Sequence, residues 1–421
     1  MTQTSVTPRR RCPLWVIALS TTLGMQINAS MLDQSLAIIA PLLTKGLGIA
    51  PERIGNLSSL SALGVVLFLL FGSPILARLG PVRMLQIGAL TAVAGLLLAT
   101  SGHWWLMMCA ALMMGIGYGP SPPAGSRILA ATAPDRHRTL IFSVKQAGAP
   151  VGGALAGLVL APIAVAWGWQ VAVLVGAAIG LTAAAIIAPV RAELDVERRH
   201  DQPLNFAAVF SPRVVAAPFA VLGANRSLLA IAFLAFSFAL VQGSLFSFSV
   251  TYLVTDRGLH LSDAAFAYAT MQACGALARV ALGWLADRTG TPARNLTIQA
   301  MAAAALVVIY GTLPVSPPFV LTALVAGAVG FLAASWNGIF LAEIARLSPA
   351  DRVAEATSAS TLCAFLGYVT GPTLFSLLVT LTGTYRWPFF IAAAQLFVMA
   401  LFQFTPFARR AHAPQATPLS R

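Results

Sequence analysis

Apolar stretches of about 20 residues recur along the whole chain, and this pattern limits the folds open to it. Such a stretch, wound as an α-helix, crosses the hydrocarbon core of a bilayer. Of the 421 residues, 58% are hydrophobic and only 9% are charged. A soluble domain carries about 25% charged residues. This chain cannot cover a soluble core with polar surface, so we infer that lipid is its solvent.

Twelve stretches each predict a membrane-spanning helix. They cover residues 14–40, 56–78, 84–101, 104–128, 139–163, 169–190, 227–254, 262–285, 295–314, 317–342, 356–380 and 386–407. The first follows three arginines and imitates a secretory signal. Its apolar part is longer than a signal core and many spans follow, so we interpret it as uncleaved.

The basic residues indicate the orientation of these spans. With the N-terminus inside, 19 Lys and Arg residues fall on the cytoplasmic side and 4 on the outer side. This bias predicts a multi-pass protein of a bacterial-type inner membrane with both termini in the cytoplasm. Topology thus explains the net charge of +13, and no nucleic-acid partner is needed.

A repeat divides the chain into two halves. "SPILARLGPVR" (73–83) resembles "GWLADRTGTPAR" (283–294), about half a chain length later. We therefore expect an all-α integral membrane fold with twelve transmembrane helices in two pseudo-symmetric six-helix bundles. The bundles would be residues 1–190 and 227–421, joined by a cytoplasmic loop at 191–226.

The second copy of the repeat contains a motif with the spacing G-x3-D-R-x-G. Its residues are Gly283, Asp287, Arg288 and Gly290. The motif resembles the cytoplasmic loop signature of the major facilitator superfamily. In the first copy Arg78 and Gly80 remain, whereas Ala77 replaces the aspartate. The resemblance implies a rocker-switch transporter with one central site and a gate at these loops, where Asp287 faces the start of the fifth helix.

Two further stretches resemble anion-transporting members of that superfamily. "GALARVALGWLADRTG" is similar to helix 8 of oxalate–formate antiporters and monocarboxylate transporters, in which an arginine four residues before the motif glycine binds a carboxylate. That position is Arg279 here. "SVKQAGAPVGGALAG" (143–157) resembles helix 5 of anion-type members such as cyanate or nitrate/nitrite porters, although the nitrate porters' own signature is not visible.

Polar residues inside the spans fall into stripes at helical spacing. The stripe on the eighth span is Tyr268, Gln272, Gly275 and Arg279, and the stripe on the first is Thr22, Gln26, Ser30 and Asp33. A charge at mid-membrane costs about 2.5–3.5 kcal/mol, so such residues face a cavity or a partner. The resemblance implies that these two helices line the central cavity.

Each candidate also has a purely structural interpretation. Arg279 could belong to an ion pair, and Lys145 could snorkel to the cytoplasm. Asp33 could be a hydrogen-bonded residue near the outer surface. Asn337, expected in mid-helix with Trp336, could bond a neighbouring helix, whereas Trp336 could form a wall of the cavity.

A site with two cations from opposite halves, Lys145 and Arg279, and one acid favours a small anion. We predict substrate contacts from Arg279, Lys145, Gln272, Gln26, Tyr268, Trp336 and Asn337. We predict that Asp33 binds a coupling proton. The predicted function is secondary active transport of a small organic anion, a carboxylate, by a monomer in the lipid bilayer.

Other functions remain open or are disfavoured. Export of a hydrophobic drug is the alternative, supported by Phe246 and Phe248, and a non-transporting receptor is not excluded. An enzyme is disfavoured because the sequence shows no nucleophile–base pair, metal cluster or phosphate loop. No cofactor or metal is expected.

Overall fold

The computed structural model describes residues 13–134, 138–195, 198, 222, 226–348 and 353–404. Within these ranges the regular structure is helical and contains no β-strand. The first half contains α1 (Leu14–Ile38), α2 (Ala40–Leu47), η1 (Pro51–Arg53), α3 (Ile54–Phe71), α4 (Ser73–Leu79), α5 (Pro81–Ala99), α6 (Trp104–Tyr118), α7 (Ser121–Thr132), α8 (Arg138–Leu155), η3 (Ala156–Leu160), α9 (Ala161–Trp167), α10 (Trp169–Ile186) and α11 (Arg191–Leu194). The second half contains α14 (Arg226–Thr255), α15 (Leu261–Thr289), α16 (Pro292–Gly311), α17 (Phe319–Ala333), α18 (Asn337–Leu347), α19 (Val353–Thr382) and α20 (Arg386–Phe402).

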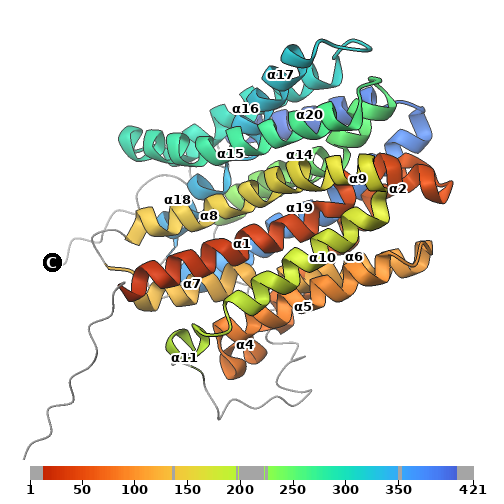
Figure 1. Ribbon diagram of the computed structural model, residues 1–421. Coiled ribbons are helices and arrows are strands. Elements are labelled where there is room, and N and C mark those ends of the chain that lie inside the picture. Colours follow the sequence, from red (N-terminus) through yellow and green to blue (C-terminus); the bar gives the residue numbers. More distant parts are fainter. Residues whose placement is uncertain are drawn as a thin grey trace, which may run out of the picture.

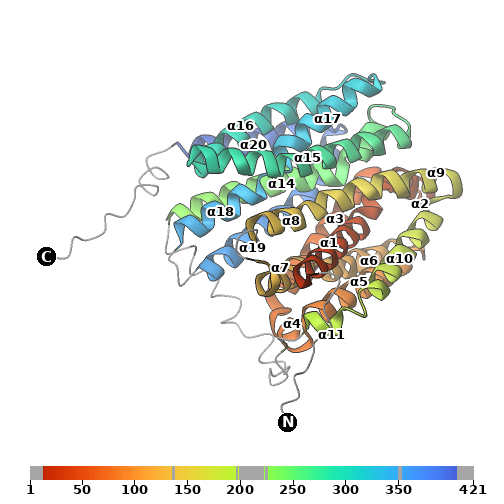
Figure 2. The same ribbon diagram turned by 60° about the vertical axis from the view of Figure 1, so that its left-hand side comes forward.

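The long helices run side by side along one common direction (Figures 1 and 2). At one end of the molecule lie α4, α11 and α18, and at the other lie α2 and α9 (Figure 1). These ends are called the α4 end and the α2 end below. Most of the predicted central loop at 191–226, and the chain before residue 13 and after residue 404, lie outside the described residues.

All twelve predicted spans coincide with helices, whose ends differ from the prediction by a few residues. Eight helical segments of the described chain are long and apolar enough to cross a membrane, or nine if α1 and α2 form one bent span. The other three predicted spans fall on α6 with α7, on α15 and on α20. Charged residues on α15, a break between α6 and α7 and the 17-residue length of α20 separate these three from the rest.

Several spans predicted as continuous helices are broken. The span at 56–78 is interrupted at Gly72, between α3 and α4. The span at 104–128 is interrupted at Gly119 and Pro120, where a proline ends the preceding helix. The span at 317–342 is interrupted at 334–336, between α17 and α18. Trp336 and Asn337 therefore lie at a helix break rather than in mid-helix, and no proline in the local sequence explains that break.

Close glycine contacts recur at equivalent places in the two halves. A Cβ on Gly115 of α6 would lie 1.8 Å from the carbonyl oxygen of Ser61 on α3. A Cβ on Gly330 of α17 would lie 1.9 Å from the carbonyl oxygen of Met271 on α15. The two glycines are separated by about half the chain, as are the two copies of the sequence repeat. Small residues of this kind let helix backbones approach closely in membranes.

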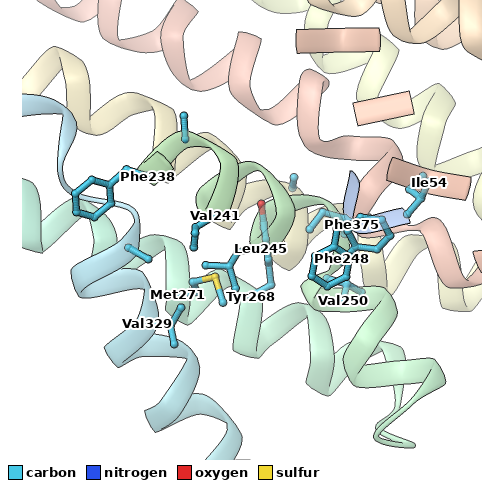
Figure 3. Close-up of a cluster of buried hydrophobic side chains, with 14 of the residues drawn as sticks. Ile54, Phe238, Val241, Leu245, Phe248, Val250, Tyr268, Met271, Val329 and Phe375 are labelled. Carbon is cyan, nitrogen blue, oxygen red and sulfur yellow. The ribbon is translucent and has the colours of Figure 1, made fainter. Parts of the chain in front are cut away.

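Large buried side chains fill the interior of the second half. Figure 3 shows Phe248 beside Phe375, and Tyr268 near Leu245 and Met271. The rings of Phe248 and Phe375 stack with their centroids 4.5 Å apart. All five side chains are buried, so α14, α15 and α19 share one apolar core.

The turn between α4 and α5 depends on a carboxylate that is distant in sequence. Asp195, after α11, accepts hydrogen bonds from the backbone N–H groups of Val82 (2.7 Å) and Arg83 (3.1 Å) at the start of α5. Burial raises the pKa of Asp195, while these N–H groups favour its ionised form and oppose the rise. Gly80 has φ 92° and packs directly against the carboxylate.

We expect Asp195→Ala to lower the thermal stability of the purified protein, because loss of a cap at a helix N-terminus costs about 0.5–2 kcal/mol. Gly80→Ala should be at least as harmful, because its Cβ would lie 2.6 Å from Cγ of Asp195. Gly283→Ala is the matched control, since a Cβ there meets no atom within 4 Å. Equal unfolding temperatures for Gly80→Ala and Gly283→Ala would contradict this account of the turn.

Candidate functional site

A cavity of 780 Å³ lies where α1, α3 and α8 of the first half face α14, α15 and α19 of the second. At the α2 end the halves touch: the Ser376 hydroxyl donates to the carbonyl of Glu52 (2.7 Å), and Gly55 packs tightly against α14 and α19. In the opposite direction the cavity wall reaches Leu76 on α4 and Thr357 on α19. The cavity is therefore closed towards the α2 end and extends towards the α4 end.

Among the described residues, Arg279 is the one lysine or arginine in the wall of this cavity. Its Nη1 donates to the carbonyl of Gln146 on α8 (2.9 Å). Its Nε and Nη2 donate to the carbonyl of Ala334 (3.4 and 3.3 Å). No described carboxylate lies within ion-pair distance of it. Of the five N–H donors of a guanidinium, these bonds leave two unused, one on each Nη.

Both carbonyls are available because each lacks a helical hydrogen-bond donor, the first because of a proline inside α8 and the second because α17 ends. In a regular α-helix the carbonyl of residue i accepts from the N–H of residue i+4. Residue 150 is proline, which has no N–H, so the carbonyl of Gln146 is released. Ala334 follows the end of α17, and its carbonyl also lacks a helical partner. Arg279 satisfies both carbonyls, and they in turn fix its orientation.

Asp33 lies on the opposite wall, on α1. Its carboxylate accepts a hydrogen bond from the hydroxyl of Ser61 on α3. It borders both the cavity and a small void of 10 Å³ that Ser58 also lines. Gln26 and Ser30 line the cavity as the stripe on the first span predicted. Thr22 does not, because it is buried and donates to the carbonyl of Ala18 (2.8 Å).

Lys145 does not face the cavity, contrary to the prediction that it contacts substrate. Its side chain is 1% exposed and lies against Gly125 of α7. Its Nζ donates to the carbonyl of Ser121 and to Oε1 of Gln146, both at 3.4 Å. The Ser121 hydroxyl donates to Gln26 (2.9 Å), whose amide donates to Tyr118 (3.0 Å). The lysine thus supports a polar wall from behind.

The predicted stripe on α15 also divides. Arg279 lines the cavity, but Tyr268 and Gln272 are fully buried and bond Gln34 of α1. Gly275 packs instead against α17, where a Cβ would lie 3.2 Å from the carbonyl of Gly330. One helical face is thus shared by several neighbours, because α8 and α17 cover α15 and the side chain of Gln34 on α1 reaches Tyr268 and Gln272.

Trp336 and Asn337 are separated by the wall of the cavity. Asn337 lines the cavity. Trp336 is 1% exposed, stacks on Phe238 with ring centroids 5.6 Å apart, and donates its indole N–H to Gln242 (2.8 Å). Tyr368 donates to the same oxygen of Gln242 (2.8 Å). Trp336 was predicted to contact substrate. Its side chain lies behind the wall instead, packed against Phe238 and Gln242 of α14.

The loop-motif residues lie at the α4 end with distinct local roles. Gly290 has φ 64° and ends α15, and Gly80 forms the α4–α5 turn. Arg288 lies over the ring of Trp284, 5.3 Å from its centroid. Asp287 is exposed and forms no hydrogen bond or ion pair with the described residues. A Cβ on Gly283 would meet no atom within 4 Å, so packing does not require a glycine there. Arg78 lies in the last turn of α4, two residues after Leu76, which lines the cavity.

Sequence patterns did not single out four polar residues of this region. They are Gln34, Tyr118, Gln242 and Tyr368. Gln242 stands alone in a long apolar run, and a glutamine in such a run signals a buried hydrogen-bonding role. The two tyrosines carry no comparable signal, because tyrosine is common in apolar cores. Gln34 lies off the stripe that ends at its neighbour Asp33.

The comparison with protein families decides the class of the molecule. The model of the Major Facilitator Superfamily matches residues 14–359.

The chain belongs to the major facilitator superfamily. It is 24% identical over 292 residues to an uncharacterised MFS-type transporter of Mycobacterium tuberculosis, covering 69% of this chain and 63% of that protein. It is 26% identical over 279 residues to the 4-hydroxybenzoate transporter PcaK of Pseudomonas putida, covering 60% and 62%. It is 24% identical over 371 residues to the hexuronate transporter of Bacillus subtilis, covering 86% and 87%.

Solved structures share the fold at low sequence identity. A peptide transporter POT variant in complex with sulfate superposes with a TM-score of 0.76 at 14% identity, covering 95% of both chains. The nucleoside transporter NupG superposes with a TM-score of 0.74 at 15% identity, covering 92% of this chain and 98% of NupG. The chain thus has the major facilitator fold, with several helices long and apolar enough to cross a membrane, and it spans about 62–63% of the length of the curated relatives first described above.

The geometry of this major facilitator cavity predicts which positions water can reach. In a cysteine-free background we expect Ser126→Cys, on the cavity wall, to react with a bulky polar thiol reagent. Ser121→Cys, on the same helix α7, should react at least about tenfold more slowly because Ser121 is 2% exposed. Mass spectrometry of the intact protein measures both rates. Comparable rates would show that the region around Lys145 is open to water.

Proposed function

We propose that this protein is a secondary active transporter of small organic carboxylates that works by alternating access. The observation that carries the proposal is the Arg279 guanidinium, which lines the cavity with two N–H groups unused and without an acidic partner among the described residues. A planar guanidinium bonds a carboxylate through two parallel N–H donors. Its fixed orientation means that little side-chain freedom is lost on binding.

The rest of the wall fits a carboxylate with an apolar body. Aromatic side chains of the wall are Phe68, Tyr118, Phe246, Phe340, Phe365 and Tyr368. Amide groups of Gln26, Gln242 and Asn337 supply hydrogen bonds between them. The named substrates of the relatives, 4-hydroxybenzoate, hexuronate and sulfoacetate, are organic anions, which supports the same class here. A neutral hydrophobic drug would leave Arg279 unpaired, so export of such compounds is less well supported.

The closed α2 end and the cavity that extends towards the α4 end correspond to one of the two states of alternating access. The excess of basic residues at the α4 end supports a cytoplasmic location for that end, with the protein in a bacterial-type inner membrane. The state described is then inward-facing. A monomer contains the whole cavity. Asp287, exposed here, is proposed to join the start of α8 when the α4 end closes.

A proton at Asp33 is proposed as the coupling ion. Asp33 and Arg279 line the same cavity, so a bound carboxylate repels ionised Asp33 and favours its protonated form. Substrate and proton binding then reinforce each other, because such linkage is reciprocal. This arrangement leads to symport of the anion with a proton.

Removal of the Arg279 guanidinium tests substrate binding. We expect Arg279→Ala to abolish uptake of carboxylates by proteoliposomes. Arg279→Lys should reduce it by about tenfold or more, because one charge-assisted bond of the planar fork is lost. Arg294→Ala is the control, since Arg294 is exposed outside the cavity. Uptake by Arg279→Ala at the wild-type rate would refute the proposed site.

Asp33→Asn tests coupling separately from binding. The amide imitates the protonated carboxyl but cannot release a proton. We expect the variant to exchange labelled for unlabelled substrate while it fails to accumulate substrate under a pH gradient. Exchange and accumulation are both measured in the same proteoliposomes. Accumulation driven by a pH gradient alone in Asp33→Asn would assign coupling to another group.

A further inference from the structure

A chain of hydrogen bonds joins the two halves near the α2 end. Oε1 of Gln34 on α1 accepts from the hydroxyl of Tyr268 and from Nε2 of Gln272 (2.5 Å), both on α15. Nε2 of Gln272 also contacts the Tyr268 hydroxyl (2.8 Å). Nε2 of Gln34 donates to Ser30 (2.7 Å), and Ser30 donates to the carbonyl of Ala149 on α8 (2.6 Å). Three helices are thus connected through side chains.

This chain fits because residue 153 is a glycine. A Cβ on Gly153 would lie 2.2 Å from Nε2 of Gln272 and 2.6 Å from Oε1 of Gln34. Tyr268 and Gln272 are 0% exposed, so this cluster can be reached only from the side of Gln34, which lines the cavity. The Tyr268 ring is also held edge-on to Phe246, with centroids 6.0 Å apart, and Figure 3 shows it among the buried apolar side chains of α14 and α15.

We propose that Gln34, Tyr268 and Gln272 form the latch that keeps the α2 end closed, and that Gln34 connects this latch to the binding cavity. The proposal rests on the alternating access proposed above. Gln34 lies one turn before the end of α1, and Tyr268 two turns after the start of α15, so both are near the α2 end. Any separation of the halves there must break the bonds from Gln34 to α15.

The position of Gln34 explains how the contents of the cavity reach the latch. Gln34 and Ser30 both line the cavity, while Tyr268 and Gln272 lie behind them. Gln34 also follows Asp33 directly in the chain. A ligand that hydrogen-bonds the Gln34 amide competes with Tyr268 and Gln272 for it. Binding in the cavity therefore weakens the contact between the halves at the closed end.

The latch also contains a weakness that allows release. Oε1 of Gln272 is buried and has no hydrogen-bond partner among the described residues. An unpaired buried acceptor carries an unfavourable desolvation cost that offsets part of the gain from the other bonds. On separation of the halves this oxygen regains water. The latch is thus strong enough to favour one state and weak enough to open.

The experiment measures the population of open α2 ends by pulsed electron paramagnetic resonance. Spin labels are placed on the full chain, without substrate, at the exposed positions Lys45 of α2 and Ser262 of α15, by way of Lys45→Cys and Ser262→Cys in a cysteine-free background. Gln272→Leu should raise the ratio of long to short distances by about tenfold, the equivalent of one lost hydrogen bond in a buried site. Gln34→Leu should act in the same direction.

Gly153→Ala is the second variant, because it leaves all three latch residues in place and only displaces the Gln272 amide. It should raise the same ratio even if Gln272→Leu fails to fold. Gln299→Leu is the matched control: its amide donates to the carbonyl of Leu332 (2.7 Å) and to Ser335 (3.0 Å), inside the second half. Gly176→Ala controls for the added methyl, since its nearest neighbour is 3.6 Å away.

A rise for Gln272→Leu and Gly153→Ala, with wild-type distances for both controls, supports the latch. Wild-type distances in folded Gly153→Ala, or an equal rise in Gln299→Leu, would overturn it. The readout needs no substrate, so its outcome is independent of the Arg279 transport assay. Failure of the carboxylate assay with shifted distances would overturn the substrate class and leave the latch standing.

Discussion

Hydrocarbon offers no hydrogen bond to a peptide group, and this constraint governs where the chain can depart from regular helix. Within the described residues the interruptions lie in protein-lined places. Pro150 releases the carbonyl of Gln146, and the break after α17 releases that of Ala334. The guanidinium of Arg279 donates hydrogen bonds to both carbonyls. The released carbonyl of α8, the break after α17 and one charged side chain within the membrane span are therefore brought together in a single cluster, and that cluster lies on the wall of the cavity.

Close helix packing follows from the same absence of water. Lipid provides little hydrophobic drive between helices, so contact depends on backbones that approach closely. Gly115 against α3 and Gly330 against α15 show this at equivalent places in the halves. The glycines of "SVKQAGAPVGGALAG" serve two partners: Gly152 packs on α1, and Gly157 packs on α15. The lysine at the head of that stretch is held by α7, with its charge kept away from lipid.

The fold could be predicted from sequence because every helix that crosses lipid needs a long apolar stretch, and such stretches are visible without knowledge of how the helices pack. The spans, the repeat and the loop motif are all local patterns. The site was predicted less completely, since helical periodicity shows which residues share a face but not which neighbour covers it. Arg279 and Asp33 were found by their charge, whereas Tyr268 and Gln272 share the face of Arg279 and yet are buried against α1. Asp195 could not be assigned to the α4–α5 turn because more than a hundred residues separate them.

The π-helical turn η3 has consequences for how the sequence of this protein can vary. Such a turn holds one residue more than an α-helical turn does, so it behaves like a one-residue insertion. It follows the tightly packed part of α8 and precedes α9, which leads to the α2 end. Deletion of a single residue there would restore an α-helix and leave α9 with nearly the same rotation, because the π turn accommodates its extra residue within one turn, while Gly152 and Gly153 kept their contacts. Relatives that differ by one residue in this helix can thus share one cavity and keep the same residues facing their neighbours beyond the turn.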